Sequence, residues 1–310
     1  MRFARVRSGL AESIHDVAVV ALDHTGAIAF ASGDTDIPFF YRSSIKPFQA
    51  LAAARAGVTL PVEHLAVTCS SHGGWPVHLA IVEQILTDYG LTTDDLQCPP
   101  GWPFPEGARD LLVRGGLSSP QGIHNNCSGK HAGWLAACRV AGWDTVRYLA
   151  PDHPIQRSVR DIVADVTGCD PEPVGVDGCG APTLRGTLEG LGRAFLRLTT
   201  DDDLAPMNDA MTRFGALIAD NTSPWGRVAI TWGHASKIGA EGVYGVATSG
   251  GAIAAKSAEG DAAMAVAAIV EAADRLGVMP DAVADRLADV RRPPVLGGGA
   301  TVGHLELVDA

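Results

Sequence analysis

Strand-like segments lie at both ends of the 310-residue chain, and helix-like segments fill its middle. Two β-rich runs separated by short turns predict one β-hairpin over residues 17–31 and another over residues 243–256. A further strand is expected at residues 302–307. We therefore expect an α/β (α+β) fold with a mixed, mostly antiparallel sheet built from both termini. Helices should flank this sheet, with a helical lobe over about residues 76–220.

Between the hairpins the pattern predicts mainly helices. Residues 65–69 are apolar and read as a short buried strand that ends in a polar, glycine-rich loop, and residues 227–231 also look strand-like. The predicted helices cover about residues 44–55, 77–89, 106–113, 132–141, 154–166, 184–197, 204–219, 261–276 and 280–289. No linker-like composition interrupts the chain, so we expect residues 1–310 to form a single domain.

Composition excludes several classes of function. A formal net charge of −11 argues against general nucleic-acid binding, which needs a basic face. No uninterrupted run of about 18 apolar residues predicts a membrane span, and no apolar segment follows the short basic start as in a secretory signal. The six cysteines include no CxxC pair and read as reduced thiols. These features predict a cytoplasmic protein that binds neither nucleic acid nor membrane.

A Ser-x-x-Lys sequence lies where an aromatic strand-like run meets an alanine-rich helix. Ser43 and Lys46 are separated by one helical turn, so their hydroxyl and amine share a face, as a nucleophile and its proton acceptor would. Phe39, Phe40 and Tyr41 precede the pair and would desolvate Lys46. A helix cap and a solvated lysine remain the alternative interpretation of these two residues.

Five glycine-framed polar loops, around Ser43, Ser71, Cys127, Cys179 and Lys237, stand out along the chain. Glycine lets the backbone approach a ligand closely, and polar residues among glycines indicate buried hydrogen bonding. One such loop is most simply explained as turn chemistry. Five of them favour a shared site.

The Lys-x-Gly sequence at Lys237 and Gly239 begins a predicted strand. Serine β-lactamases and penicillin-binding proteins combine Ser-x-x-Lys with a later Lys-x-Gly sequence. Gly239 would keep the flank of the strand open for substrate, and a second lysine near Lys46 would disfavour its protonation. Lys256 competes with Lys237 for this role.

Cys127 and Cys179 are each surrounded by glycine and by asparagine or aspartate. Cysteine is a soft ligand suited to zinc. Their separation along the chain does not distinguish a zinc site from two structural thiols.

Together these loops resemble the type III L-asparaginases, also called the thermolabile or Rhizobium-etli-type asparaginase II family. The matching stretches occur in the family's order: Arg42-Ser43-Ser44-Ile45-Lys46-Pro47, Cys69-Ser70-Ser71-His72, Asn126-Cys127-Ser128-Gly129-Lys130-His131-Ala132-Gly133, Pro151-Asp152-His153-Pro154-Ile155-Gln156, Asp177-Gly178-Cys179-Gly180-Ala181-Pro182-Thr183 and Lys237-Ile238-Gly239-Ala240-Glu241-Gly242.

The resemblance implies a fold like serine β-lactamases and transpeptidases, hydrolysis of L-asparagine to L-aspartate and ammonia, and a homodimer. It implies Ser43 as nucleophile with Lys46 as its base, and Ser71 with Lys237 as a second Ser-Lys pair. The implied zinc ligands are Cys127, Lys130 and Cys179. The expected substrate contacts are His72, Asp177 and Gly239, with support of the zinc ligands an alternative role for Asp177.

The chain departs from the family pattern in places. The segment over residues 199–232 looks shorter, and Ser70 could replace Ser71 in the alignment. Three alternatives therefore stay open. They are a serine-dependent glutaminase or other amidase of the same fold, a zinc-dependent amidohydrolase without a covalent step, and a zinc-binding module with reduced activity.

Overall fold

The computed structural model describes residues 1–309, which contain one large antiparallel sheet. Its order is β11-β12-β1-β2-β10-β9-β8, and β3 also pairs with β2. The strands are β1 (Arg2–Arg7), β2 (Leu10–Asp23), β3 (Ile28–Ser32), β8 (Ser236–Gly239), β9 (Val243–Thr248), β10 (Gly251–Ser257), β11 (Pro294–Gly297) and β12 (Ala300–Asp309). Both predicted hairpins are confirmed, and so is the antiparallel sheet built from both ends of the chain.

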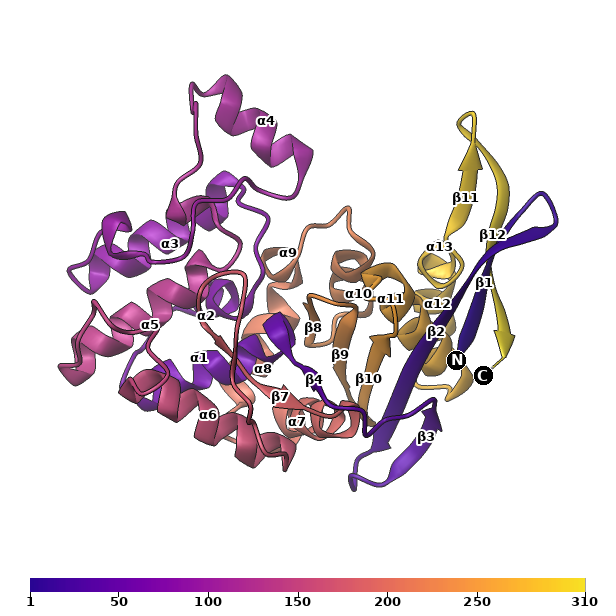
Figure 1. Ribbon diagram of the computed structural model, residues 1–310, viewed down its shortest axis with the longest axis horizontal. Helices are drawn as coiled ribbons and strands as arrows, with labels where there is room; N and C mark the ends of the chain where they lie inside the picture. The colour runs from indigo at the N-terminus through magenta and orange to yellow at the C-terminus, as the bar shows by residue number, and fades with distance from the viewer. Residues whose placement is uncertain (310) are drawn as a thin grey trace.

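The long strand β2 joins the two parts of this sheet. Its first half pairs with β1, whereas its second half pairs with β10, in a register that places Val17 opposite Ser257 and Asp23 opposite Gly251. Figure 1 shows β1, β2, β11 and β12 running out from the rest of the molecule as a curled ribbon. The N-terminal and C-terminal strands lie side by side because β1 pairs with β12.

Alternating side chains of the sheet pack into two separate hydrophobic cores. Val20 and Leu22 pack into the core shared with α7 (Leu188–Thr200), and Val19 and Ala21 pack into the core of α11 (Ala262–Arg275). Because successive strand residues point to opposite faces, α7 and α11 cover opposite sides of the sheet. This explains why β9 and β10 are buried along almost their whole length.

The helical lobe lies beside the sheet (Figure 1). Its helices are α1 (Lys46–Arg55), α2 (Val62–Cys69), α3 (Pro76–Asp88), α4 (Glu106–Arg114), α5 (Ser128–Ala141), α6 (Pro154–Thr167), α8 (Ala205–Arg213) and α9 (Gly215–Ile218). The remaining elements are η1 (Arg42–Ile45), η2 (Thr93–Asp95), η3 (Gly122–His124), α10 (Pro224–Trp232), α12 (Asp281–Arg286), α13 (Ala288–Arg291) and the two-residue strands β4 (Phe39–Phe40), β5 (Gly175–Val176), β6 (Pro182–Thr183) and β7 (Arg185–Gly186). Within residues 1–309 no helix is long and apolar enough to cross a membrane. The predicted α/β class, a mostly antiparallel sheet flanked by helices with a helical lobe, is thus confirmed.

Two predicted strands are wrong. Residues 65–69 belong to helix α2, and residues 227–231 belong to helix α10. A short buried apolar run has the same composition in a helix as in a strand, so periodicity cannot separate them. The helix signals lay outside the runs: Ser223 caps α10 by accepting from the Gly226 N–H, and Gly233 ends it in the left-handed conformation.

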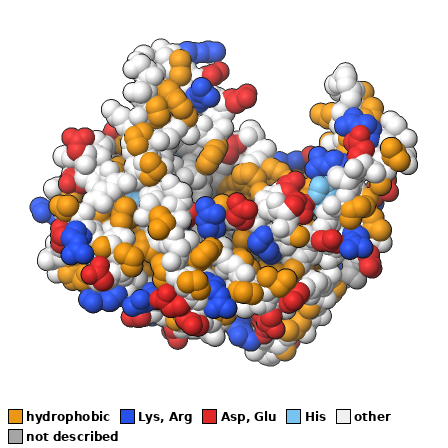
Figure 2. Space-filling view, in the orientation of Figure 1, with side chains coloured by type: hydrophobic (Ala, Val, Ile, Leu, Met, Phe, Trp, Pro, Cys, Tyr) orange, Lys and Arg blue, Asp and Glu red, His pale blue; other side chains and the backbone are white. Residues whose placement is uncertain are grey.

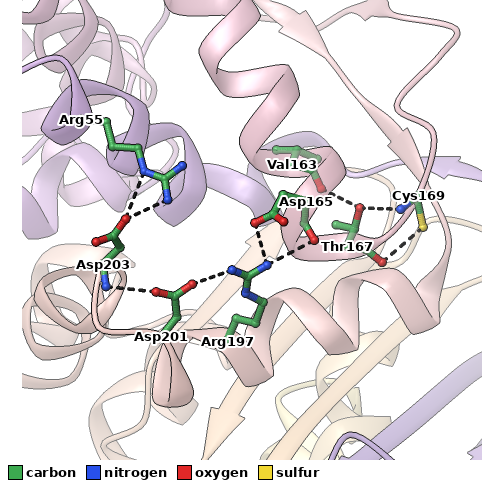
Figure 3. Close-up of polar contacts among 8 residues, drawn as sticks. All are labelled: Arg55, Val163, Asp165, Thr167, Cys169, Arg197, Asp201 and Asp203. Carbon is green, nitrogen blue, oxygen red and sulfur yellow. Dashed lines mark hydrogen bonds and ion pairs between the residues drawn. The ribbon is translucent and has the colours of Figure 1, made fainter.

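Charged side chains fasten the lobe to α7 (Figure 3). Arg197 of α7 donates to Asp165 of α6 and to Asp201, each at 2.7 Å. Arg55, at the end of α1, binds Asp203 at 2.8 Å. These contacts connect α1 and α7 to the turn that follows α7, and α7 to α6.

Candidate active site

The hydroxyl of Ser71 lies between two buried lysine amines. Lys237 Nζ on β8 is 2.7 Å from Ser71 Oγ, and Lys46 Nζ at the start of α1 is 3.1 Å from the same atom. Both lysine side chains are almost completely buried, with 0% and 1% exposure for Lys46 and Lys237. Residues far apart in the sequence, from a helix, a loop and a strand, therefore meet at one hydroxyl group.

Carbonyl groups complete the surroundings of the two amines. Lys46 Nζ also donates to Ser70 O at 2.6 Å and to Asn126 O at 3.4 Å, so it faces three acceptors. Lys237 Nζ contacts its neighbour Ile238 O at 2.7 Å. Burial, and then the positive charge of Lys46, place the pKa of Lys237 well below its ordinary value. An uncharged Lys237 amine can accept a proton from Ser71.

Ser43 lies in η1, one turn before Lys46, but the two side chains are not hydrogen-bonded. Among residues 1–309 its half-buried hydroxyl has no hydrogen-bond partner. The amine of Lys46 points instead to Ser71. The predicted Ser43–Lys46 pair thus shares a turn of the chain, whereas the predicted Ser71–Lys237 pair is in direct contact.

Gly239 holds β8 against η1. A Cβ at this position would lie 2.8 Å from the Tyr41 carbonyl oxygen, closer than real Cβ contacts, and a tight 3.1 Å from Ser44 N. The glycine is therefore required for the approach of two backbone segments. Its missing side chain makes room for the turn that carries Ser43, in addition to any space for substrate.

The three predicted zinc ligands lie together next to this cluster. Lys130 Nζ on α5 donates to Cys179 Sγ at 3.2 Å, and its ammonium lies 4.6 Å from the centre of the Trp134 ring. The Cys179 thiol donates to the sulfur of Cys127, which places the pKa of Cys127 well below its ordinary value. Two sulfurs and an amine converge from α5 and from the loop between β5 and β6. This donor set fits a soft ion such as zinc, provided that Lys130 gives up its proton.

Among residues 1–309 no group of three His, Cys, Asp or Glu side chains is arranged to hold a metal ion. The cluster of Cys127, Lys130 and Cys179 falls outside that description because its third member is a lysine. Only the chemistry of the donors favours a metal there.

A family model described as L-asparaginase II matches residues 4–307, nearly the whole chain. This protein belongs to the L-asparaginase II family. Family membership makes it an amidohydrolase, and the predicted resemblance is confirmed. A comparison with curated proteins found no significant match.

Solved structures similar to this L-asparaginase II family member include the native form of a protein named Mglu. It is 16% identical, with a TM-score of 0.49, over 87% of this chain and 67% of Mglu. A β-lactamase from Mycobacterium bovis is 15% identical, with a TM-score of 0.43, over 88% of this chain and 94% of its own. A class A β-lactamase from Clostridium kluyveri is 14% identical, with a TM-score of 0.32, over 78% and 84% of the two chains.

Asp177 connects the loop that carries Cys179 to the turn that carries Ser43. It accepts from Arg42 Nε at 2.8 Å and from its neighbour Gly178 N at 2.7 Å. Burial alone would raise the pKa of Asp177, but the charges of Lys130 and Arg42 outweigh it and lower that pKa. Asp177 therefore faces the zinc-ligand cluster through Lys130 and the Ser43 turn through Arg42.

Arg42 is a functional candidate that sequence reasoning missed. Its φ of +53° is in the left-handed region, which costs a residue with a side chain about 1–2 kcal/mol. Strain of this kind is found at functional sites, where surrounding contacts hold it in place. Arg42 stands directly before Ser43 in the Arg-Ser-Ser-Ile-Lys-Pro stretch. No sequence signal indicated that its partner would be a carboxylate 135 positions away.

The ring of His72 is buried and hydrogen-bonded within the protein. It is 1% exposed, and both of its nitrogens are engaged: Nε2 lies 2.9 Å from Ser128 Oγ, and Nδ1 accepts from Gly74 N at 3.2 Å. The His72 ring therefore has no free nitrogen with which to make the predicted substrate contact.

One face of the molecule is hollowed. Figure 2 shows the hollow between the projecting α4 region and the β11–β12 end of the sheet. A cavity of about 560 Å³ lies between β2, β10 and the start of α7, and Lys256 is among the residues that line it. Lys256 donates to Ser257 O and takes no part in the Ser71 cluster, so Lys237 is the lysine that the fold brings to Ser71.

Proposed function

We propose that this amidohydrolase is an L-asparaginase, which hydrolyses L-asparagine to L-aspartate and ammonia through a Ser-Lys mechanism with an acyl-enzyme intermediate. The observation that carries the proposal is the Ser71 hydroxyl held between Lys46 and Lys237. A hydroxyl between two amines can receive a proton from one side and pass one on from the other. Such a chain suits a reaction that first removes a proton from a nucleophile and then protonates ammonia.

Ser43 is the proposed nucleophile. Its hydroxyl is free of protein partners, whereas Ser71 is committed to the two lysines. The uncharged Lys237 amine would first take a proton from Lys46 through Ser71, which leaves the Lys46 amine, one turn after Ser43, able to take the Ser43 proton. The Ser71–Lys237 pair would then deliver a proton to the leaving ammonia. Backbone N–H groups of η1 and β8 are the proposed donors to the oxyanion, and losing one such donor costs about 10²-fold or more in rate. Water then releases aspartate.

Cys127, Lys130 and Cys179 are the proposed zinc ligands. When bound, zinc would supply a positive charge that orients the charged end of the amino-acid substrate. The residues of this chain prepare that site on their own: contact with Cys179 lowers the pKa of Cys127, and Asp177 and Arg42 fix the loop that carries Cys179.

The decisive experiment compares Ser43→Ala, Ser71→Ala and Ser119→Ala, the last an exposed control. Purified proteins are assayed with asparagine, glutamine and a β-lactam side by side. Acid-quenched reactions are analysed by mass spectrometry for an aspartyl adduct. We expect asparagine turnover with the adduct on the peptide that contains Ser43, loss of both in Ser43→Ala, and wild-type behaviour in Ser119→Ala.

Full asparagine hydrolysis by Ser43→Ala would remove the nucleophile assignment. Turnover that survives in Ser43→Ala but is abolished by a chelator would favour the zinc-dependent route without a covalent step. Preference for glutamine would instead identify the protein as a serine-dependent glutaminase. The proposed homodimer and zinc content are read from the same preparation by light scattering and elemental analysis.

A further inference from the structure

The loop that presents Ser71 is anchored to the start of α5 through its neighbour His72. The His72 backbone N–H donates to Asn126 O at 3.2 Å, and this same carbonyl accepts from Lys46 Nζ. The ring then reaches Ser128, the first residue of α5. Backbone and side chain of one residue thus bind the segment from which Cys127 and Lys130 arise.

The hydrogen bonds fix the protonation state of this ring. Ser128 Oγ donates its proton to Ile123 O at 2.8 Å, so toward His72 it can only accept. His72 Nε2 must then carry the hydrogen, and the bare Nδ1 accepts from Gly74 N. Only the neutral Nε2–H tautomer satisfies all three contacts. Burial, with the neighbouring His78 and Lys46, also places the pKa of His72 well below its ordinary value.

A second histidine packs against the His72 ring. His72 stacks on His78 with ring centres 5.3 Å apart and planes at 21°. His78 stands in the first turn of α3, where its Nδ1 accepts from Trp75 N. A protonated His72 would lose the bond to Gly74 and place a cation against Lys46.

We propose that His72 is a positioning residue, whose neutral ring fixes Ser71 between Lys46 and Lys237 by clamping the loop over residues 70–74 to Ser128. This inference rests on the proposed Ser-Lys function, and it replaces the substrate contact expected from sequence. A positioning residue acts on the rate of the chemical step, whereas a substrate contact acts on binding. The two roles therefore predict different kinetics.

The experiment uses His72→Gln, Ser128→Ala and the double variant, with His24→Gln as an exposed histidine control. His72→Gln keeps a donor for Ser128 but removes the ring acceptor for Gly74. Ser128→Ala removes the acceptor for Nε2–H and leaves the histidine in place. Steady-state kinetics with asparagine give kcat and KM, and the rate of labelling by a fluorophosphonate, a general serine-reactive probe, is followed by mass spectrometry.

We expect kcat to fall at least tenfold in each single variant, with KM within twofold of wild type. The kcat of the double variant should be no lower than that of the less active single variant, because both changes break the same pair of contacts. Labelling should slow by a similar factor, and His24→Gln should match wild type. If His72→Gln does not fold, as judged by its unfolding midpoint, Ser128→Ala gives the same comparison.

A raised KM with unchanged kcat would overturn the proposal in favour of a substrate contact. Values within twofold of wild type in both single variants would overturn it as well. A wild-type protein that takes label but hydrolyses neither asparagine nor glutamine refutes the proposed substrate only, and the labelling rates then decide the role of His72. A wild-type protein with neither activity nor labelling has no activated serine to position, which also refutes the inference.

Discussion

At the scale of single residues, Lys237 is a group whose charge the fold controls. Its amine is surrounded by Lys46 of α1, Cys69 of α2, and Cys127 and Lys130 at the start of α5. Burial and the adjacent cation place the pKa of Lys237 well below 10.5. The unfolded chain still holds that proton up to about its ordinary pKa, so between the two values the unfolded state binds more protons. Stability should therefore rise with pH across this interval.

Lys237→Met tests whether this lysine makes stability rise with pH. The thioether removes the titrating group, so the rise in unfolding free energy between pH 6 and pH 9 should be smaller than in wild type. A single group contributes at most about 1.4 kcal/mol per pH unit. Urea denaturation at several pH values measures the difference between the two proteins. The same proton governs activity: wild-type kcat should fall as acid protonates Lys237, and Lys237→Met should be inactive at every pH. Parallel stability curves for the two proteins would contradict the assignment.

At the scale of secondary structure, α11 carries a buried carboxylate that the site does not use. Glu271 is 3% exposed and accepts from Arg275 on its own helix and from Arg291 of α13. Burial alone would raise the pKa of Glu271, but the two arginines outweigh it and lower that pKa. The stabilising effect is complete above the ordinary pKa and is lost as the pH falls through the lowered value.

Glu271→Gln should lower the unfolding free energy at pH 7 by about 2 kcal/mol, because the buried side chain then loses its charge-assisted bonds to two partly exposed arginines. The turnover of the folded fraction should not change, since α11 covers the face of the sheet opposite α7. Asp209→Asn, which removes an exposed pair with Arg213, is the matched control and should cost less than about 1 kcal/mol. Urea denaturation beside steady-state assays measures both effects. A loss of kcat in Glu271→Gln would mean that α11 influences the site.

Elements that carry their own start and stop signals could be predicted from sequence. The hairpin over residues 243–256 and the helix α3 are examples, because turn residues and amphipathic spacing lie within the segment itself. The first strand β1 was missed, since its Arg-rich sequence is stabilised only by β2 and β12 on either side. Helix α2 was missed because its apolar residues are buried by neighbouring helices rather than by a sheet.

The same limit applies to the site. The resemblance to the asparaginase family implied that Ser71 and Lys237 form a pair, and the fold brings them into contact. The contact of Lys46 with Ser71, the partner of Arg42 and the hydrogen bonds of His72 all depend on segments far away in the sequence. Side-chain direction at these positions is decided by packing, which a single sequence does not reveal. The catalytic and zinc-binding roles themselves stay predictions.

At the scale of the whole molecule, the site lies where the sheet meets the helical lobe, and Gly239 governs that junction. Gly239→Ala places a methyl group 2.8 Å from the Tyr41 carbonyl oxygen, so β8 and η1 must separate. We expect kcat to fall at least tenfold, because Lys237 moves with β8, and stability to fall by about 1–3 kcal/mol. Gly250→Ala, with nothing within 4 Å of the added atom, is the matched control and should be close to wild type. Steady-state kinetics and urea denaturation test both, and an active Gly239→Ala would show that the junction tolerates the shift.

The pairing of β2 with β10 has a consequence for how the protein is made. Val17 pairs with Ser257, so this part of the sheet can form only after the ribosome has made most of the chain. Until then β2 pairs only with β1 and β3 and leaves one edge open, and contacts of such long sequence separation form slowly. Lys237 emerges with the same late segment. A growing chain therefore gains its complete sheet and its second lysine almost together, so an unfinished molecule lacks the paired amines around Ser71.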